Sequence, residues 1–140
     1  MTQQKNFYGQ NVYVEFHDAR FTKFELTPSG DIVVEFSHLP VYQKETEEHY
    51  TIWSYQAVLR LSRVSNLSMD QIQCDWIMED NLFADDHSLL TSFSDNFEHV
   101  RAFEFTLIDG AVIRGNVSTM SLSLTRRGEK SDDWRGPLLQ

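Results

Sequence analysis

Apolar and polar residues alternate along much of the chain with a period of two, which is typical of β-strands that bury one face. The first such run places Val12, Val14 and Phe16 on one side. The next two runs flank residues 28–31, Pro-Ser-Gly-Asp, where Pro presets φ and Gly accepts the positive φ of a tight turn. We therefore predict an antiparallel hairpin over residues 23–37.

The longest alternating pattern extends over residues 50–64, where Trp53 and Tyr55 share one parity with smaller apolar residues. The spacing of three and four that a helix requires fits this segment less well. We expect a strand that bends near residues 56–57. The polar residues 43–49 that precede it are typical of an exposed loop.

The middle of the chain is less regular than its ends. Residues 72–76 predict another strand, whereas residues 79–99 show no clear period and leave room for a short helical turn near residues 89–90. Alternation returns at residues 103–107 and 112–117, and the Asp-Gly pair between them predicts a second hairpin.

The remaining residues complete the predicted fold. Residues 120–124 alternate with serines and predict a final strand, while residues 128–140 are polar and predict a loosely ordered C-terminal tail. About eight strands in meander order, with at most one short helix, predict an all-β, mainly antiparallel fold. A sandwich, a curved sheet and an up-and-down barrel all fit this order. No repeat or linker divides the chain, so we expect residues 1–140 to form a single domain.

The composition agrees with a globular protein. Of 140 residues, 41% are hydrophobic, which is too many for a disordered chain and enough for a core. The apolar runs are too short for a membrane-spanning helix, and the chain begins without a secretory signal pattern. A single cysteine excludes an intramolecular disulfide and argues against a zinc site built from cysteines. We expect a cytoplasmic location.

The charge balance bears on the kind of partner. There are 21 acidic and 12 basic residues, for a net charge of -9. The tightest basic cluster, around Arg126 and Arg127, is interleaved with carboxylates whose field largely cancels it. This balance argues against nucleic acid, whose binding requires uncompensated Lys and Arg. It favours a basic protein partner, whose approach the negative charge would steer.

Two groups of residues are candidates for binding an ion or a partner. The first is a metal set of His17, Asp18 and His38, because two neighbouring strands could bring both imidazoles to one carboxylate. The second group is the cluster of Asp80, Asn81, Asp85 and Asp86. Its side chains offer the oxygen atoms that calcium prefers, but their spacing is not that of a calcium-binding loop. We expect it to be a solvated acidic loop and the strongest candidate for contact with a basic partner. Its proposed partner-binding residues are Asp80, Asp85 and Asp86.

Motifs for catalysis are absent from the sequence. No nucleophile elbow, phosphate loop or dinucleotide fingerprint is present, and Cys74 lies on an apolar parity typical of an inert buried thiol. We therefore assign no catalytic residue and no cofactor. A hydrolase or lyase that uses Glu15, Glu35 or His17 is the weakest of the hypotheses that we retain.

The aromatic residues support two interpretations. Trp53, Tyr55 and Trp76 could line a ligand cavity or stack on a sugar. The interpretation that we favour places them in the hydrophobic core, since a small β domain needs large aromatic side chains for burial. A homodimer formed through an edge strand is a further possibility.

Part of the N-terminal half resembles known families. Residues 16–20, Phe-His-Asp-Ala-Arg, and residues 30–36, Gly-Asp-Ile-Val-Val-Glu-Phe, lie within the stretch 12–39, which resembles the opening hairpin of small bacterial β-rich families. Several of those families are uncharacterised, and some are grouped with immunity proteins of contact-dependent or polymorphic toxin systems. The resemblance implies no catalytic residues. Our leading hypothesis is a non-enzymatic bacterial domain that binds a basic protein, and the alternative is a small-ligand-binding β domain.

Overall fold

The computed structural model describes residues 12–86, 89–90 and 97–136, and in these residues every regular element is a β-strand. All strand pairs are antiparallel. The all-β prediction is therefore confirmed. The strands are β1 (Val12–Val14), β2 (Arg20–Leu26), β3 (Ile32–Thr46), β4 (His49–Ser62), β5 (Ser65–Met69), β6 (Ile77–Phe83), β7 (Leu89–Leu90), β8 (Ala102–Leu107), β9 (Val112–Asn116) and β10 (Thr119–Arg135).

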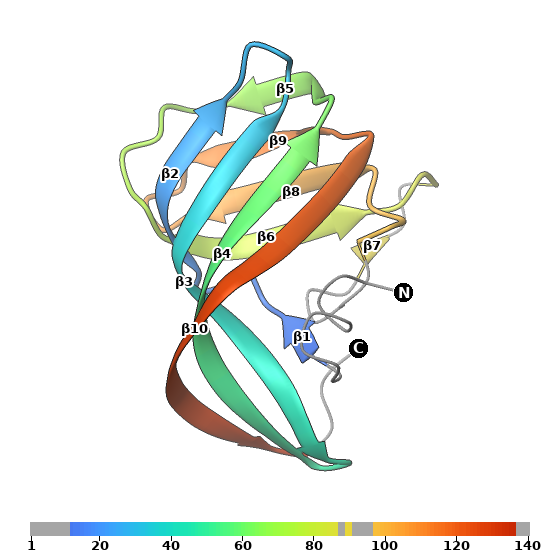
Figure 1. Cartoon of the computed structure of the whole chain (residues 1–140). Coiled ribbons are helices and arrows are strands. Elements are labelled where there is room, and N and C mark those ends of the chain that lie inside the picture. The colour runs from blue at the N-terminus through green and yellow to red at the C-terminus, as the bar shows by residue number, and fades with distance from the viewer. Residues whose placement is uncertain (1–11, 87–88, 91–96, 137–140) are drawn as a thin grey trace.

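The strands form two five-stranded sheets that face each other (Figure 1). The first sheet has the order β1-β3-β4-β10, with β2 also paired to β3, and the second has the order β5-β9-β8-β6-β7. Neither order closes on itself, so the predicted up-and-down barrel is excluded, and the two sheets are consistent with the predicted sandwich or curved sheet. The order is a meander only in part, because β5 and β10 pair with β9 and β4 rather than with their neighbours in sequence.

The core lies between the sheets because period-two alternation directs one set of side chains inward from each. Val34, Leu59 and Leu122 are cross-strand neighbours in the first sheet and are at most 1% exposed. From the edge of that sheet, Phe16 reaches Phe105 in the second, with ring centroids 5.8 Å apart. The favoured placement in the core is correct for Tyr55, which is 1% exposed, whereas Trp53 and Trp76 are only partly buried.

The two predicted hairpins are confirmed. Gly30 and Gly110 adopt φ angles of 87° and 92° in the turns between β2 and β3 and between β8 and β9. Only glycine adopts such angles without strain from a Cβ atom.

Three strands continue beyond the second sheet and form a twisted arm (Figure 1). We define the arm as residues 39–46 of β3, 49–55 of β4 and 126–135 of β10, in which β4 pairs with β3 on one side and with β10 on the other. The predicted exposed loop at residues 43–49 is therefore wrong for most of its length, because β3 continues to Thr46 and β4 begins at His49. No alternation marks residues 43–46 as strand, because they are polar and none of them is buried.

The predicted loose tail is also wrong up to Arg135. Residues 128–135 belong to β10, which pairs with β4 as far as the match of Arg135 with His49. The strand contains three register shifts, and at one of them a Cβ atom on Gly128 would lie 2.9 Å from the Ser54 carbonyl oxygen. Glycine at this position permits the close approach of the two strands. Residues 137–140 lie outside the described part of the chain.

The middle of the chain contains two further corrections. Residues 77–83 form strand β6 and residues 89–90 form strand β7, where a loop and a helical turn were expected. Residues 72–76 form no strand, and Trp76 alone makes an isolated bridge, to Arg20. Residues 87–88 and 91–96 lie outside the described part of the chain. No helix in the described ranges is long and apolar enough to cross a membrane.

Candidate functional site

At one corner of the sandwich, the turn between β1 and β2 is attached to the start of β6. The Asp18 amide donates to the Ile77 carbonyl at 2.9 Å, and the Ile77 amide donates to the Ala19 carbonyl at 2.9 Å. Asp18 has a φ of 69°, in the left-handed region that Asp tolerates better than most residues. These contacts hold Glu15, His17 and Asp18 next to the second sheet.

Asp80 is the most unusual residue of this corner. It lies in β6, is only 7% exposed, and its Oδ2 has no hydrogen-bond partner. Burial, and after it the negative charge of Glu15, raises the pKa of Asp80 to about 7, while the imidazole and backbone N–H of His17 act in the opposite direction. Near neutral pH, the Asp80 carboxyl is therefore protonated in a large fraction of molecules.

Glu15 connects Asp80 to the other groups of the corner. Its Oε2 accepts a hydrogen bond of 2.8 Å from the Tyr42 hydroxyl, and its Oε1 lies 3.4 Å from His17 Nδ1. The same His17 nitrogen lies 3.5 Å from Asp18 Oδ2. We call Glu15, His17, Asp18, Tyr42 and Asp80 the acidic corner. Burial, together with the bond to Glu15, raises the pKa of Tyr42, so the phenol remains a donor.

The predicted metal set lies in this region but is not assembled into a metal site. His17 approaches Asp18, whereas His38 Nδ1 lies 2.6 Å from Ser54 Oγ. Burial lowers the pKa of His38, and the Asp18 carboxylate partly opposes this effect. Among the residues that the structure describes, no three His, Cys, Asp or Glu side chains are placed to hold a metal ion.

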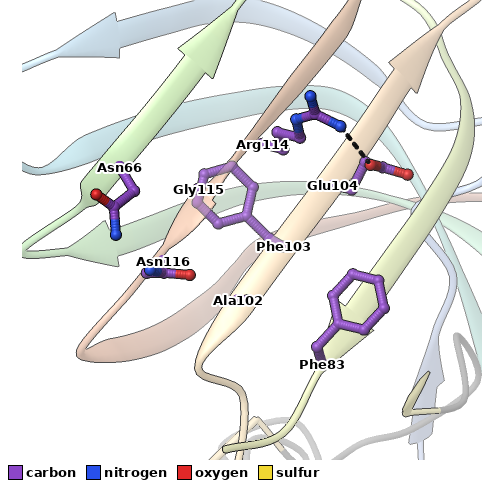
Figure 2. A pocket seen from close by; sticks show the side chains of 8 residues that line it. All are labelled: Asn66, Phe83, Ala102, Phe103, Glu104, Arg114, Gly115 and Asn116. Atoms are coloured by element: carbon purple, nitrogen blue, oxygen red, sulfur yellow. Dashed lines mark ion pairs between the residues drawn. The ribbon is translucent and has the colours of Figure 1, made fainter. Parts of the chain in front are cut away.

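A shallow hollow lies on the outer face of the second sheet and has a volume of about 200 Å³ (Figure 2). Figure 2 shows two asparagines at one end, Phe83 at the other and an ion pair along the side. In that pair, Arg114 Nη1 lies 3.8 Å from Glu104 Oε2. We call this surface the outer hollow. Its lining residues are Asn66, Phe83, Ala102, Phe103, Glu104, Arg114, Gly115 and Asn116.

A second hollow of about 270 Å³ contains two of the predicted partner-binding residues, Asp85 and Asp86. We call it the acidic hollow, and Ala84, His99 and Arg101 complete its lining. The guanidinium of Arg101 donates from Nη1 to the carbonyl oxygens of two neighbouring residues, at 2.7 and 2.8 Å. Its Nε lies 3.8 Å from Asp85 Oδ1, which is a long ion pair.

The third predicted partner-binding residue, Asp80, does not belong to this surface. The expected solvated loop is wrong at Asp80, because the residue lies within β6 and faces the core. A register shift between Ile77 and Glu79 reverses the alternation, so that Asp80 and Leu82 lie on the buried side.

The predicted ligand-binding aromatics do not come together around one cavity. Tyr55 is 1% exposed in the core. Trp53 lies on the arm, with the Arg127 guanidinium carbon 4.3 Å from its ring centroid. Trp76 lies 6.4 Å from the ring of His38, measured between centroids. None of the three lines either hollow described above.

Glu15 and Glu35, the two carboxylates of the hydrolase or lyase hypothesis, are not brought together. Glu35 Oε2 lies 3.5 Å from Lys23 Nζ on the neighbouring strand, whereas the negative charge of Glu15 raises the pKa of Asp80. Sequence reasoning also missed Tyr42 as the donor to Glu15. One feature of the sequence could have indicated that Asp80 faces inward: it stands two residues before the apolar Leu82, so both side chains lie on the same face of a strand.

Comparison with known proteins identified no relative of this chain. No protein-family model, no curated protein and no solved structure matches it. Function is therefore inferred from the geometry of the acidic corner and of the two hollows.

Proposed function

We propose that this protein is a non-enzymatic, cytoplasmic bacterial domain that binds a basic partner protein, as an immunity protein binds a toxin. The observation that carries this proposal is the acidic hollow, a depression of about 270 Å³ whose lining includes the consecutive residues Asp85 and Asp86. A lysine or arginine side chain of the partner would enter this depression and place its positive charge between the two carboxylates.

The charges around the acidic hollow favour such a contact. The Asp85 side chain is 86% exposed, so its carboxylate is accessible to an approaching protein. Arg101, the cation in the lining, is oriented by its hydrogen bonds to two backbone carbonyls. The net charge of -9 would increase the rate at which a basic partner arrives.

The dimensions of the two hollows favour a protein over a drug-sized ligand. Their volumes of about 200 and 270 Å³ are below the roughly 300–1,000 Å³ that is typical of small-molecule pockets. A protein partner needs no deep pocket, because a few central side chains inserted in shallow depressions provide most of the binding energy.

The acidic corner supports a structural role better than a catalytic one. It has the paired carboxyls of an acid–base site, but Asp80 is only 7% exposed and the Glu15 side chain only 15%. A general acid must reach the substrate atom that it protonates, within about 2.6–3.2 Å or through one water molecule. Burial of these two carboxyls works against that contact.

The test is affinity capture from the native host with three versions of the protein. We expect the wild type to retain a basic protein at one-to-one stoichiometry, and to release it as the salt concentration rises. The double variant Asp85→Lys with Asp86→Lys should lose this partner. The control Glu48→Lys, at the exposed tip of the arm, adds positive charge away from the acidic hollow and should retain it.

Two results would contradict the proposal. One is that no basic protein is retained by the wild type at any salt concentration. The other is that the double variant retains the partner as well as Glu48→Lys does, which would show that the acidic hollow is not the contact. Circular dichroism of the three proteins establishes beforehand that each has folded.

A further inference from the structure

We propose that the outer hollow is a binding site for a neutral, polyhydroxylated ring, such as the pyranose ring of a sugar. This site lies on the outer face of the second sheet and is distinct from the acidic hollow and the acidic corner. The proposal rests on three features of the lining. They are a flat apolar floor, polar side chains at one end and along one side, and one acidic and one basic residue whose charges balance.

The floor is flat because the residue at its centre, Ala102, has a small side chain. Ala102 of β8 is the cross-strand neighbour of Phe83 on one side and of Asn116 on the other. A depression therefore forms between the Phe83 ring and the asparagine, although both residues lie on the same face of the sheet (Figure 2).

Gly115 permits the close packing of β5 beside β9 in the second sheet. A Cβ atom on this residue would lie 3.2 Å from the Ser65 carbonyl oxygen and 3.3 Å from Val64 Cγ1. Contacts this short would push β5 away from β9. The glycine therefore supports the position of the strand that carries Asn66.

Two side-chain amides form one end of the outer hollow. Asn66 and Asn116 are exposed, and neither side-chain amide has a hydrogen-bond partner within the described part of the chain. Asn66 lies in a register shift of β5, between Ser65 and Ser68, and has a φ of 52°. Bulges of this kind often redirect a side chain next to a functional site. Each amide can donate and accept hydrogen bonds, as a sugar hydroxyl can.

The charged residues of the lining cancel each other. Glu104 and Arg114 are opposite each other on β8 and β9, and their closest charged atoms are 3.8 Å apart. Glu104 Oε1 also accepts a hydrogen bond of 3.4 Å from the amide of Asn81. A ligand with a net charge would be attracted by one of the pair and repelled by the other. A neutral ligand can instead receive bonds from the guanidinium and donate bonds to the carboxylate.

The opposite end of the outer hollow offers an apolar surface. The Phe83 ring is half-buried and stands at the rim, on the strand next to that of Ala102 (Figure 2). The C–H face of a pyranose can pack on such a ring while its hydroxyls reach the polar side. A volume of about 200 Å³ leaves room for one ring. The binding energy available to so small a ligand corresponds to a Kd on the order of 1 mM.

The test is an NMR titration of ¹⁵N-labelled protein with glucose, galactose and N-acetylglucosamine as separate probes. We expect at least one sugar to shift the backbone signals of Ala102 and Asn116 and the side-chain amide signals of Asn66, in a saturable way. Glycylglycine, a zwitterion that could engage both charges of the ion pair, serves as the competing probe. It should produce no saturable shift of these signals.

Two variants locate the site. Phe83→Ala should weaken the binding of the sugar by roughly 2- to 10-fold, the range expected for the loss of one aromatic contact. Ala102→Leu fills the floor and should abolish the shifts. The matched control is Thr106→Leu, which places the same side chain on the same face of β8 outside the lining, and it should bind normally.

Several outcomes would overturn the proposal. They are the absence of a saturable shift with all three sugars, shifts with glycylglycine in place of the sugars, and normal sugar binding by a folded Ala102→Leu variant. The test is independent of the proposed protein partner. Asp85→Lys with Asp86→Lys should bind the sugar normally, and Ala102→Leu should retain the protein partner.

Discussion

Replacement of Asp80 by asparagine should remove a pH-dependent cost from the folded state. The substitution keeps the shape of the side chain but eliminates its charge, and the new amide can donate a hydrogen bond towards Glu15. In the wild type, the corresponding oxygen is buried and has no partner. We therefore expect Asp80→Asn to be more stable than the wild type at neutral and alkaline pH.

The magnitude follows from the pKa. Folding raises the pKa of Asp80 from an ordinary 3.8 to about 7, and each tenfold change in an acidity constant corresponds to about 1.4 kcal/mol. Because the folded state binds the proton more tightly than the unfolded state, this group adds stability at low pH. The contribution is complete below about pH 4 and is lost as the pH rises to about 7, a change of about 4 kcal/mol.

The assay is urea denaturation of both proteins at several pH values between about 4 and 8. The difference in the free energy of unfolding should be small at the acidic end and should grow to about 4 kcal/mol in favour of Asp80→Asn at the alkaline end. Glu79→Gln, which neutralises the exposed neighbour on the same strand, is the control and should stay within about 0.5 kcal/mol of the wild type. A difference between Asp80→Asn and the wild type that does not change with pH would refute the reasoning.

Three further substitutions test packing and hydrogen bonds. Gly128→Ala should lower the free energy of unfolding by about 1–3 kcal/mol, because its Cβ would lie 2.9 Å from a carbonyl oxygen of β4, and thermal denaturation measures the loss. Tyr42→Phe removes the donor to the carboxylate of Glu15 and should cost about 1.5–3 kcal/mol in urea denaturation, whereas an unchanged midpoint would contradict the bond. Arg127→Ala removes the cation above Trp53 and should cost about 0.5–1 kcal/mol, with a change in tryptophan fluorescence that Arg127→Lys largely avoids.

The parts of the fold that sequence reasoning predicted correctly are those where one face of a strand is buried. The hairpin over residues 23–37 combines regular alternation with a turn sequence whose glycine requires a positive φ. Both signals are local and follow directly from the chemistry of the backbone. The hairpin formed by β8 and β9 was predicted for the same reasons.

Two parts of the arm, residues 43–46 of β3 and residues 128–135 of β10, were missed because none of these residues is buried. Residues 128–135 are held by pairing with β4, although most of their side chains are exposed. Hydrogen bonds to a partner strand distant in sequence leave no periodic pattern in the residues themselves. A polar segment of this kind therefore resembles a tail.

The acidic corner was only partly predictable, for two physical reasons. The bulge in β6 reverses the alternation, so that Asp80 faces inward where a regular strand would place it outside. The contact of Tyr42 with Glu15 depends on β1 pairing with the distal half of β3, a long-range register that local patterns do not specify. His17 and Asp18 were recognised only as part of the metal set with His38, and Glu15 only as a residue of the hydrolase or lyase hypothesis.

The position of β10 in the first sheet has a consequence for biosynthesis. β4 pairs with β10 along almost its whole length, yet the two strands are separated by the entire second sheet in sequence. As the chain leaves the ribosome, the edge of β4 that pairs with β10 stays without a partner strand until β10 has been synthesised. During that interval it presents unpaired backbone groups to other chains, which is the condition for aggregation. A chain truncated before Thr119 would carry this exposed edge permanently.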